Sequence, residues 1–157
     1  MAVPVIVDGY NLLFLDHRNP DQSAREALRN QLTRYSVLKG RTILLVFDGA
    51  KGGSGAPTPR DAAGVTVYYS SGKERADDLI RRLVRERREA VVVTSDRDLA
   101  RSVERLGAAV ISSRSFQHRL EQALTPEESS EWDEDDEEGS TEERPGKSRH
   151  RAWLKGL

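Results

Sequence analysis

Carboxylates that directly follow short apolar runs are the residues of this sequence best suited to chemistry. Each run is rich in Val, Ile or Leu, and the acids that follow the runs are Asp8, Asp48 and Asp96, with Asp98 two residues beyond the last. In a parallel sheet the carboxyl ends of the strands meet at one edge, where ligands bind. Several carboxylates at one edge repel one another, so a cation must offset them, and oxygen ligands suit Mg²⁺ or Mn²⁺ rather than zinc.

A further acid comes from the pair Asp77 and Asp78, which begins a predicted helix. At about 100° per residue, Asp77 lies about 90° from the centre of the apolar face and Asp78 about 170° from it. We therefore expect Asp77 to reach the site and Asp78 to face water. The convergence of Asp8, Asp77 and Asp96 on one edge favours a functional role for these three.

The remaining polar candidates also have structural interpretations. Ser95 with Asp98 matches a capping box, and Asp48 in Phe-Asp-Gly is typical of a turn. Asn11, just past the first apolar run, is suited either to bind a phosphate or ligand or to cap a turn. Both interpretations stay open for each of these residues.

The elements that must position these residues alternate between apolar runs and amphipathic stretches, the pattern of β-α-β units around a parallel sheet. The predicted strands are Val3–Val7, Thr42–Phe47, Val65–Tyr69, Ala90–Thr94 and Ala108–Ile111. Apolar residues at helical spacing predict helices over residues 23–39, 76–84, 99–106 and 116–124. In the first helix Ser23 and Glu26 match a capping box, and Gly40 marks the end. The glycine- and proline-rich stretch 49–63 is predicted to be a mobile loop.

Composition limits the class of protein. The 157 residues are 32% charged and 36% hydrophobic, which suits one domain. No apolar run approaches the roughly 18 residues of a membrane helix, and no signal peptide is recognisable, so we expect a cytoplasmic protein without membrane contact. The absence of cysteines excludes a disulfide framework, and three scattered histidines do not suggest a zinc site.

Charge divides the chain into two regions. Residues 1–125 hold 20 Lys and Arg against 15 Asp and Glu, a net charge of +5, whereas residues 126–157 hold 5 against 11, a net charge of −6. We predict a globular domain over 1–125 with a polyanionic partner, followed by an acidic then basic tail over 126–157 that is mostly disordered. A short docked helix over residues 149–157 is the alternative for the end of the tail, anchored by Trp153, Leu154 and Leu157.

Four segments, in this order, resemble the NYN domain and, within it, the bacterial YacP-like group. They are VDGYNLL at 7–13, VFDG at 46–49, ERADDLI at 74–80 and TSDRDL at 94–99. The resemblance covers about residues 3–124. It implies a PIN-like, Rossmann-like α/β fold, a three-layer sandwich whose parallel five-stranded sheet has the order 3-2-1-4-5. It also implies Mg²⁺-dependent endoribonuclease activity.

Carried onto matching positions, the resemblance implies a catalytic set of Asp8, Asp77 and Asp96 supported by Asn11, Asp48 and Asp98. The metal ligands would be Asp8, Asp77, Asp96 and Asp98, which would hold Mg²⁺ or Mn²⁺ for attack of water on an RNA phosphodiester. The helix motif has Ala-Asp-Asp where the family pattern has Ala-Asp-Glu, which keeps a carboxylate. Some YacP-like proteins cleave messenger RNA in association with the ribosome, so messenger RNA and the ribosome are the partners that the resemblance suggests.

Basic and aromatic residues near the same edge are the candidates for RNA contact: Tyr10, Lys51, Arg60, Lys73, Arg81 and Arg97. Tyr10 is suited either to stack on a base or to pack in the core. For each arginine the alternative is an ordinary solvated helix face.

Two other functions stay open on the sequence alone. A non-catalytic RNA- or ribosome-binding module would use the acids only structurally, although the presence of every motif acid argues against it. Another Mg²⁺-dependent phosphodiesterase or phosphatase is the second alternative. The first apolar run lacks the Asp-x-Asp of haloacid-dehalogenase-type phosphatases, which argues against that class.

Overall fold

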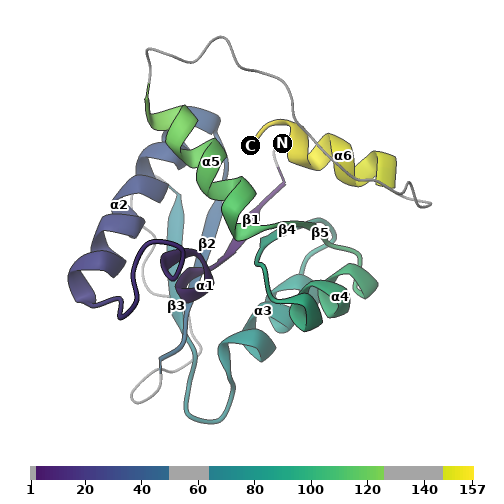
Figure 1. Cartoon of the computed structure of the whole chain (residues 1–157). Coiled ribbons are helices and arrows are strands. Elements are labelled where there is room, and N and C mark those ends of the chain that lie inside the picture. The colour runs from purple at the N-terminus through teal and green to yellow at the C-terminus, as the bar shows by residue number, and fades with distance from the viewer. Residues whose placement is uncertain (1–2, 50–63, 126–146) are drawn as a thin grey trace.

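A parallel five-stranded sheet lies between two layers of helices in the computed structural model, which describes residues 3–49, 64–125 and 147–157 (Figure 1). The elements in chain order are β1 (Val5–Asp8), α1 (Gly9–Leu13), α2 (Gln22–Lys39), β2 (Ile43–Phe47), β3 (Val65–Tyr69), α3 (Ala76–Arg85), β4 (Val91–Val93), α4 (Arg97–Arg105), β5 (Ala109–Ile111), α5 (Ser113–Leu124) and α6 (Lys147–Lys155). The strand order is β3-β2-β1-β4-β5, with every pair parallel. The predicted fold class and strand order are confirmed.

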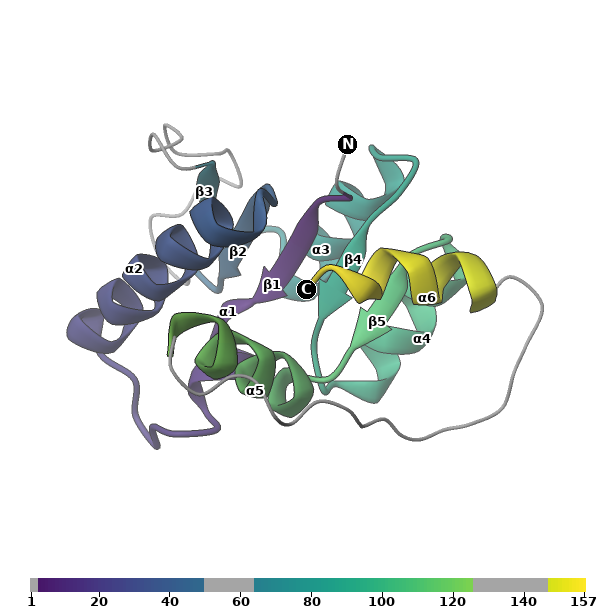
Figure 2. The same ribbon diagram turned by 90° about the horizontal axis from the view of Figure 1, so that it is seen from above.

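Helices cover both faces of the sheet because successive strand residues point to opposite sides. Val5, Val7 and Leu45 face α1, α2, α5 and α6 in one buried cluster. Ile6 and Val92 face α3 and α4 in the other. Figure 2 shows α2 and α5 side by side in the first of these layers. Burial on both sides explains why the strands are continuous apolar runs in the sequence.

The ends of α2 correct one prediction and confirm another. Asp21, rather than Ser23, caps the N-terminus, and its carboxylate accepts a hydrogen bond of 3.0 Å from the amide of Ala24. The predicted capping box of Ser23 and Glu26 is wrong because the N-cap, Asp21, lies two residues before Ser23 and the helix already begins at Gln22. Gly40 ends the helix with a left-handed φ of 63°, a conformation that glycine adopts without strain.

Two local predictions have other outcomes. The five-residue helix α1 follows β1 without an intervening loop and was not predicted, because five residues contain too little periodicity to recognise. The predicted mobile loop lies, from residue 50 to 63, outside the described residues. Within the described ranges no helix is long and apolar enough to cross a membrane.

The end of the predicted tail is folded. Residues 147–155 form α6, and Trp153, Leu154 and Leu157 pack against the cluster that contains α2 and α5. Arg41 donates to the carbonyl of Trp153 at 3.2 Å, and Arg119 donates to that of Leu154 at 2.7 Å. Cations favour the C-terminal end of a helix, where carbonyls lack partners. The docked-helix alternative therefore describes this segment, while residues 126–146 of the predicted tail lie outside the described residues.

Candidate active site

The carboxyl edge of the sheet carries three of the predicted acids at the point where strand order reverses. β1 and β4 are neighbours, with Val7 opposite Val93, although β2 and β3 lie between them in the sequence. Asp8 ends β1, Asp96 caps α4 just after β4, and Asp77 lies in the first turn of α3. Ligands bind at such reversal points in parallel sheets. The topology thus gathers side chains that are far apart in the sequence.

Asp8 is the most perturbed of these acids. Its pKa is raised to about 6, mainly by burial and also by the negative charges of Asp77 and Asp96, while hydrogen bonds from Thr94 and from the backbone of Asn11 lower it. The Thr94 hydroxyl donates to Oδ2 of Asp8 at 2.9 Å. A partly buried carboxylate beside two like charges is typical of functional sites and favours the approach of a cation.

The two neighbouring acids of α3 differ as the helix geometry predicted. Asp77 is partly buried, and its pKa is raised by burial and by the charge of Asp96. Asp78 is exposed and forms an ion pair of 2.9 Å with Arg81. Arg81 also lowers the pKa of Asp77, though less than burial raises it. Asp77 is the member of this pair whose charge contributes to the raised pKa of Asp8.

Asp96 acts as the N-cap of α4. Its Oδ1 accepts hydrogen bonds from the amides of Asp98 at 3.0 Å and Leu99 at 3.3 Å. The predicted capping box of Ser95 and Asp98 is therefore wrong. The carboxylate of Asp98 is exposed.

Asn11 is held by residues from two other elements. Its Oδ1 accepts from the amide of Ser95 at 2.8 Å and from the hydroxyl of Ser113 at 2.6 Å. The amide of Ser113 in turn donates to the hydroxyl of Ser95 at 3.0 Å. This network joins α1, the β4–α4 turn and the start of α5. Because both bonds use the amide oxygen, the NH₂ group of Asn11 is left to donate to a ligand.

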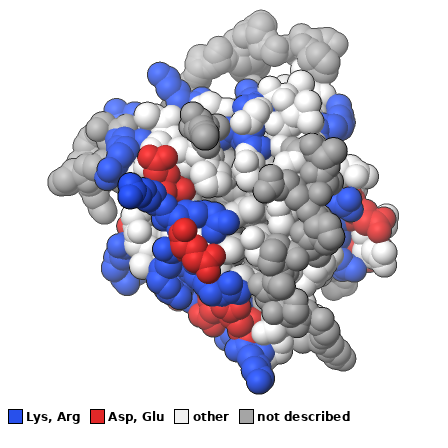
Figure 3. Space-filling model, turned by 180° about the vertical axis from the view of Figure 1, so that it is seen from behind, with Lys and Arg blue, Asp and Glu red and all other residues white. Residues whose placement is uncertain are grey.

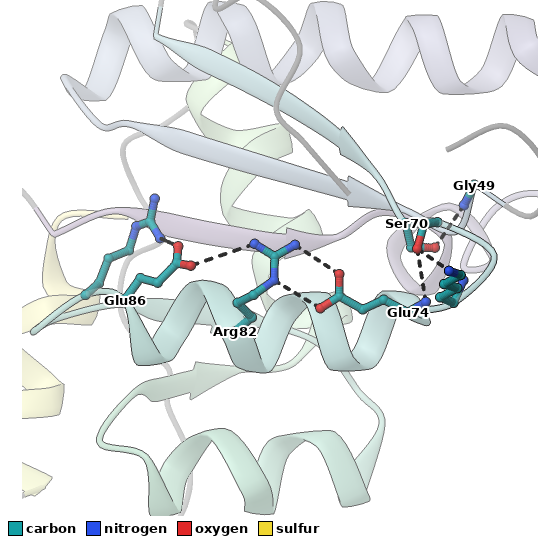
Figure 4. A network of polar contacts seen from close by, with 8 residues as sticks. Gly49, Ser70, Glu74, Arg82 and Glu86 are labelled. Carbon is teal, nitrogen blue, oxygen red and sulfur yellow. Dashed lines mark hydrogen bonds and ion pairs between the residues drawn. The ribbon is translucent and has the colours of Figure 1, made fainter. Parts of the chain in front are cut away.

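Asp48 lies at the same carboxyl edge, directly after β2, the strand that neighbours β1. It is exposed at the end of β2, and its Oδ1 accepts from the Ser70 hydroxyl at 3.1 Å. The Ser70 hydroxyl also accepts from the amide of Gly49 at 3.0 Å, a contact seen in Figure 4. This geometry matches the turn interpretation, and its supporting role stays a prediction.

The donor chemistry of the site fits a hard divalent cation. Asp8, Asp77 and Asp96 offer carboxylate oxygens, the ligands that Mg²⁺ and Mn²⁺ prefer, and the charges of Asp77 and Asp96 raise the pKa of Asp8. Among the residues that the structure describes, no three His, Cys, Asp or Glu side chains stand close enough together to hold a metal. The acids are thus close enough for the charge of one to shift the pKa of another. To bind a cation, their side chains must move closer together.

The predicted RNA contacts divide into three groups. Lys73 and Arg97 are exposed. Tyr10 packs against Phe47 with ring centroids 5.1 Å apart, and its hydroxyl accepts from Arg25 at 3.1 Å, so its packing interpretation is the one observed. Arg81 donates to Ser102 of α4 at 2.7 Å as well as to Asp78. Lys51 and Arg60 lie outside the described residues.

Basic side chains along α3 are mostly paired. Figure 3 shows acidic side chains among the basic ones on the face seen from behind. In Figure 4 Arg82 lies between Glu74 and Glu86, with ion-pair distances of 2.9 and 3.7 Å. Such surface pairs add little stability, but they neutralise the charge of the helix. A uniformly positive RNA-binding face along α3 is not what these residues form.

Several site residues were missed by sequence reasoning. Thr94, Ser95, Ser113 and Ser70 hold the acids and Asn11 through contacts between distant segments. Serine and threonine are too common near strand and helix ends for their presence to indicate such a role. The one available signal was the position of Thr94 at the end of a strand, two residues before Asp96.

Comparisons with known proteins agree with this architecture. The model of the YacP-like NYN domain family matches residues 5–155. A crystal structure of Rae1 (YacP) from Bacillus subtilis is similar, with 24% sequence identity and a TM-score of 0.64 over 78% of this chain and 75% of that one. A single-substitution mutant of the same protein gives 23% identity and a TM-score of 0.63 over 78% and 77%. A comparison with curated proteins finds no matching relative.

Proposed function

The chain belongs to the YacP-like NYN domain family, and from this premise we propose that it is an endoribonuclease that hydrolyses phosphodiester bonds of RNA. The observation that supports the proposal is that Asp77 and Asp96 raise the pKa of Asp8, and Asp96 that of Asp77, at the reversal point of the sheet. Like charges held together by the fold are costly unless a cation or a reacting group uses them.

Asp8, Asp77 and Asp96 would hold a Mg²⁺ or Mn²⁺ ion. When bound, the cation supplies activation of an attacking water and charge stabilisation at the leaving oxygen. Asp98 lies next to this set in the sequence and is the candidate for a ligand acting through water. The assignment of Asp98 rests on the family resemblance alone.

The surrounding residues orient the acids and the substrate. The Thr94 hydroxyl fixes Oδ2 of Asp8, and the N-cap bonds of Asp96 fix its Oδ1. The NH₂ group of Asn11 is suited to donate to a phosphate oxygen, because Ser95 and Ser113 occupy the amide oxygen. Hydrogen bonds of this kind hold a phosphodiester in line with the attacking water.

Messenger RNA is the substrate that the family resemblance favours, with the ribosome as a partner. A direct test compares cleavage of an end-labelled messenger RNA, naked and in a translating extract, by wild-type protein and by the Asp8→Asn, Asp96→Asn double variant. Each reaction is run with Mg²⁺ and with EDTA. We expect metal-dependent cuts from the wild type and none from the double variant. Cuts that appear only during translation would make the ribosome a required partner.

The absence of a preformed ligand cluster among the described residues favours one other candidate, a non-catalytic RNA-binding module. The same experiment separates the two functions. Equal inactivity of wild type and double variant in both settings, with RNA binding retained, would refute the nuclease. Equal cleavage by both proteins would instead refute the assignment of the site.

A further inference from the structure

Four aromatic rings form a continuous row at the carboxyl edge of the sheet, the edge that also carries the acids. Tyr10 and Phe14 come from α1 and its C-terminal end, Phe47 ends β2, and Tyr69 ends β3. Successive ring centroids are 6.1 Å apart for Phe14 and Tyr10, 5.1 Å for Tyr10 and Phe47, and 5.7 Å for Phe47 and Tyr69. The row therefore runs across the C-terminal ends of α1, β2 and β3.

Gly9 fixes this row against the residue that follows β1. A Cβ atom at Gly9 would lie 2.5 Å from Cε1 of Phe47 and 2.9 Å from the carbonyl oxygen of Val46. Only glycine permits such a close approach. Because Gly9 directly follows Asp8, Phe47 in the middle of the row packs against the residue next to the most perturbed acid of the site.

The centre of the row is buried, whereas its two ends are open. Phe47 is 2% exposed, but Phe14 is 58% exposed and Tyr69 is 38% exposed. The other large apolar side chains that are exposed in the described ranges are aliphatic: Val37, Leu38 and Leu106. The two exposed aromatic side chains among these are thus the two ends of the row.

Cationic groups accompany the row. The guanidinium of Arg25 donates to the hydroxyl of Tyr10 at 3.1 Å, and Arg25 is partly buried. Arg18 and Lys73 are exposed in the segments that follow Phe14 and Tyr69. Aromatic faces combined with cations are the means by which proteins bind single-stranded nucleic acid, since bases stack on the rings and phosphates meet the cations.

We propose that Phe14 and Tyr69 form a stacking platform for unpaired bases on either side of the scissile phosphate, so that the site takes single-stranded RNA. This inference rests on the proposed function, because the acids define where the phosphate lies. In a duplex the bases are stacked on one another and cannot reach the rings. The platform therefore determines specificity for unpaired over paired RNA.

The test measures binding separately from cleavage. In the Asp8→Asn, Asp96→Asn background, Phe14→Leu and Tyr69→Leu keep apolar volume and remove the ring. Affinity is measured for a short single-stranded RNA with an internal 2-aminopurine, whose fluorescence is quenched by stacking, and for a duplex of the same sequence. We expect each variant to weaken single-strand binding by about 5- to 100-fold and to reduce the quenching, with little change for the duplex. Phe14→Trp and Tyr69→Phe keep an aromatic ring and should therefore retain both the single-strand affinity and the quenching.

Leu38→Ala is the matched control, because Leu38 is 60% exposed on α2. It should leave the affinity unchanged, and circular dichroism shows whether each variant is folded. Unchanged single-strand affinity in both ring variants would overturn the platform. An equal loss of duplex affinity would also overturn the platform. If RNA binding is intact and the variants instead change the mass of the protein particle in light scattering, the row is a contact between protein copies, which likewise overturns the platform. Lack of RNA cleavage by the wild type would refute the proposed nuclease function. It would not change the result of this binding test, which decides the platform alone.

Discussion

The Thr94 hydroxyl donates to Oδ2 of Asp8 at 2.9 Å, although the two residues are 86 positions apart in the sequence. The same hydroxyl oxygen accepts from the amide of Asp96 at 3.1 Å. One side chain therefore fixes the end of β1 relative to the start of α4. It holds two of the three coupled acids in place.

Thr94→Val should preserve the fold and impair cleavage. Valine has nearly the shape of threonine but lacks the hydroxyl, so both hydrogen bonds are lost. We expect kcat/KM on a labelled RNA to fall about 10- to 100-fold, since the orienting bond to a charged group contributes roughly 1.5–3 kcal/mol. Thr94→Ser keeps the hydroxyl and should retain activity within about threefold. Equal rates for all three proteins would show that the hydroxyl does not position the acids.

Asp77→Asn and Asp78→Asn form a matched pair on one helix. Asp77 is coupled to Asp96, whereas Asp78 is exposed and paired with Arg81. We expect Asp77→Asn to lower the cleavage rate by at least about 100-fold and Asp78→Asn to change it less than about threefold. Single-turnover cleavage at saturating Mg²⁺ is the measurement. A larger loss in the Asp78 variant would reverse the assignment of the two acids.

Without metal, Asp8 should make stability depend on pH. Its pKa is about 6 in the folded protein and 3.8 as the ordinary value, so the folded state binds its proton more tightly. The protonated carboxyl of Asp8 therefore stabilises the folded state, and this stabilisation is fully present below about pH 4 and is lost as the pH rises to about 6. Asp8→Asn cannot lose this proton. The measured quantity is the difference in the free energy of unfolding in EDTA, Asp8→Asn variant minus wild type. This difference should increase by on the order of 2–3 kcal/mol between pH 4 and pH 7, because the wild type becomes less stable.

Urea unfolding at several pH values measures this difference, and Asp78→Asn is the control because Asp78 is exposed. A difference that does not change with pH would mean that Asp8 is not destabilised by its surroundings. With saturating Mg²⁺ the advantage of the variant should shrink, because the bound cation stabilises the ionised wild type.

The sequence predicted the parts of the fold that depend on local pattern. The strands are buried on both faces, so each is a continuous apolar run, and the angle of Asp77 on its helix follows from the helical repeat. The coupling of Asp8 with Asp96 followed from parallel strands ending at one edge. These features require no knowledge of distant contacts.

Features that depend on distant contacts could not be predicted. Ser113 meets Asn11 across 102 positions, and no local pattern indicates that contact. Helix caps were misassigned because Asp21 and Asp96 have competing serines beside them. Asp48 follows its strand as Asp8 does, but its side chain is exposed and bonded to Ser70, which only the structure reveals.

Gly9→Ala should destabilise the protein because the added Cβ would meet Phe47 at 2.5 Å and the backbone of Val46 at 2.9 Å. The ring or α1 must move, and we expect a loss of about 1–3 kcal/mol in the free energy of unfolding. Gly72→Ala is the control, since no atom lies within 4 Å of a Cβ there. It should change stability by less than about 0.5 kcal/mol. Equal urea midpoints for the two variants would contradict the close approach.

Arg119→Met should loosen α6 without unfolding the sheet. The guanidinium of Arg119 donates to the carbonyl of Leu154 at 2.7 Å, at the end of a helix whose carbonyls attract cations. Methionine keeps much of the apolar stem, so the substitution mainly removes the charged hydrogen bond. For this partly exposed group, that bond contributes about 1–2 kcal/mol to the docking of α6. Hydrogen exchange of amides in residues 150–157 should become about 10-fold faster, while amides of β1 and β4 keep their protection. Arg114→Met, on an exposed position of the same helix α5, is the matched control and should leave exchange in α6 unchanged. Equal protection of α6 in both variants would mean that its apolar anchors, Trp153, Leu154 and Leu157, hold it without the arginine.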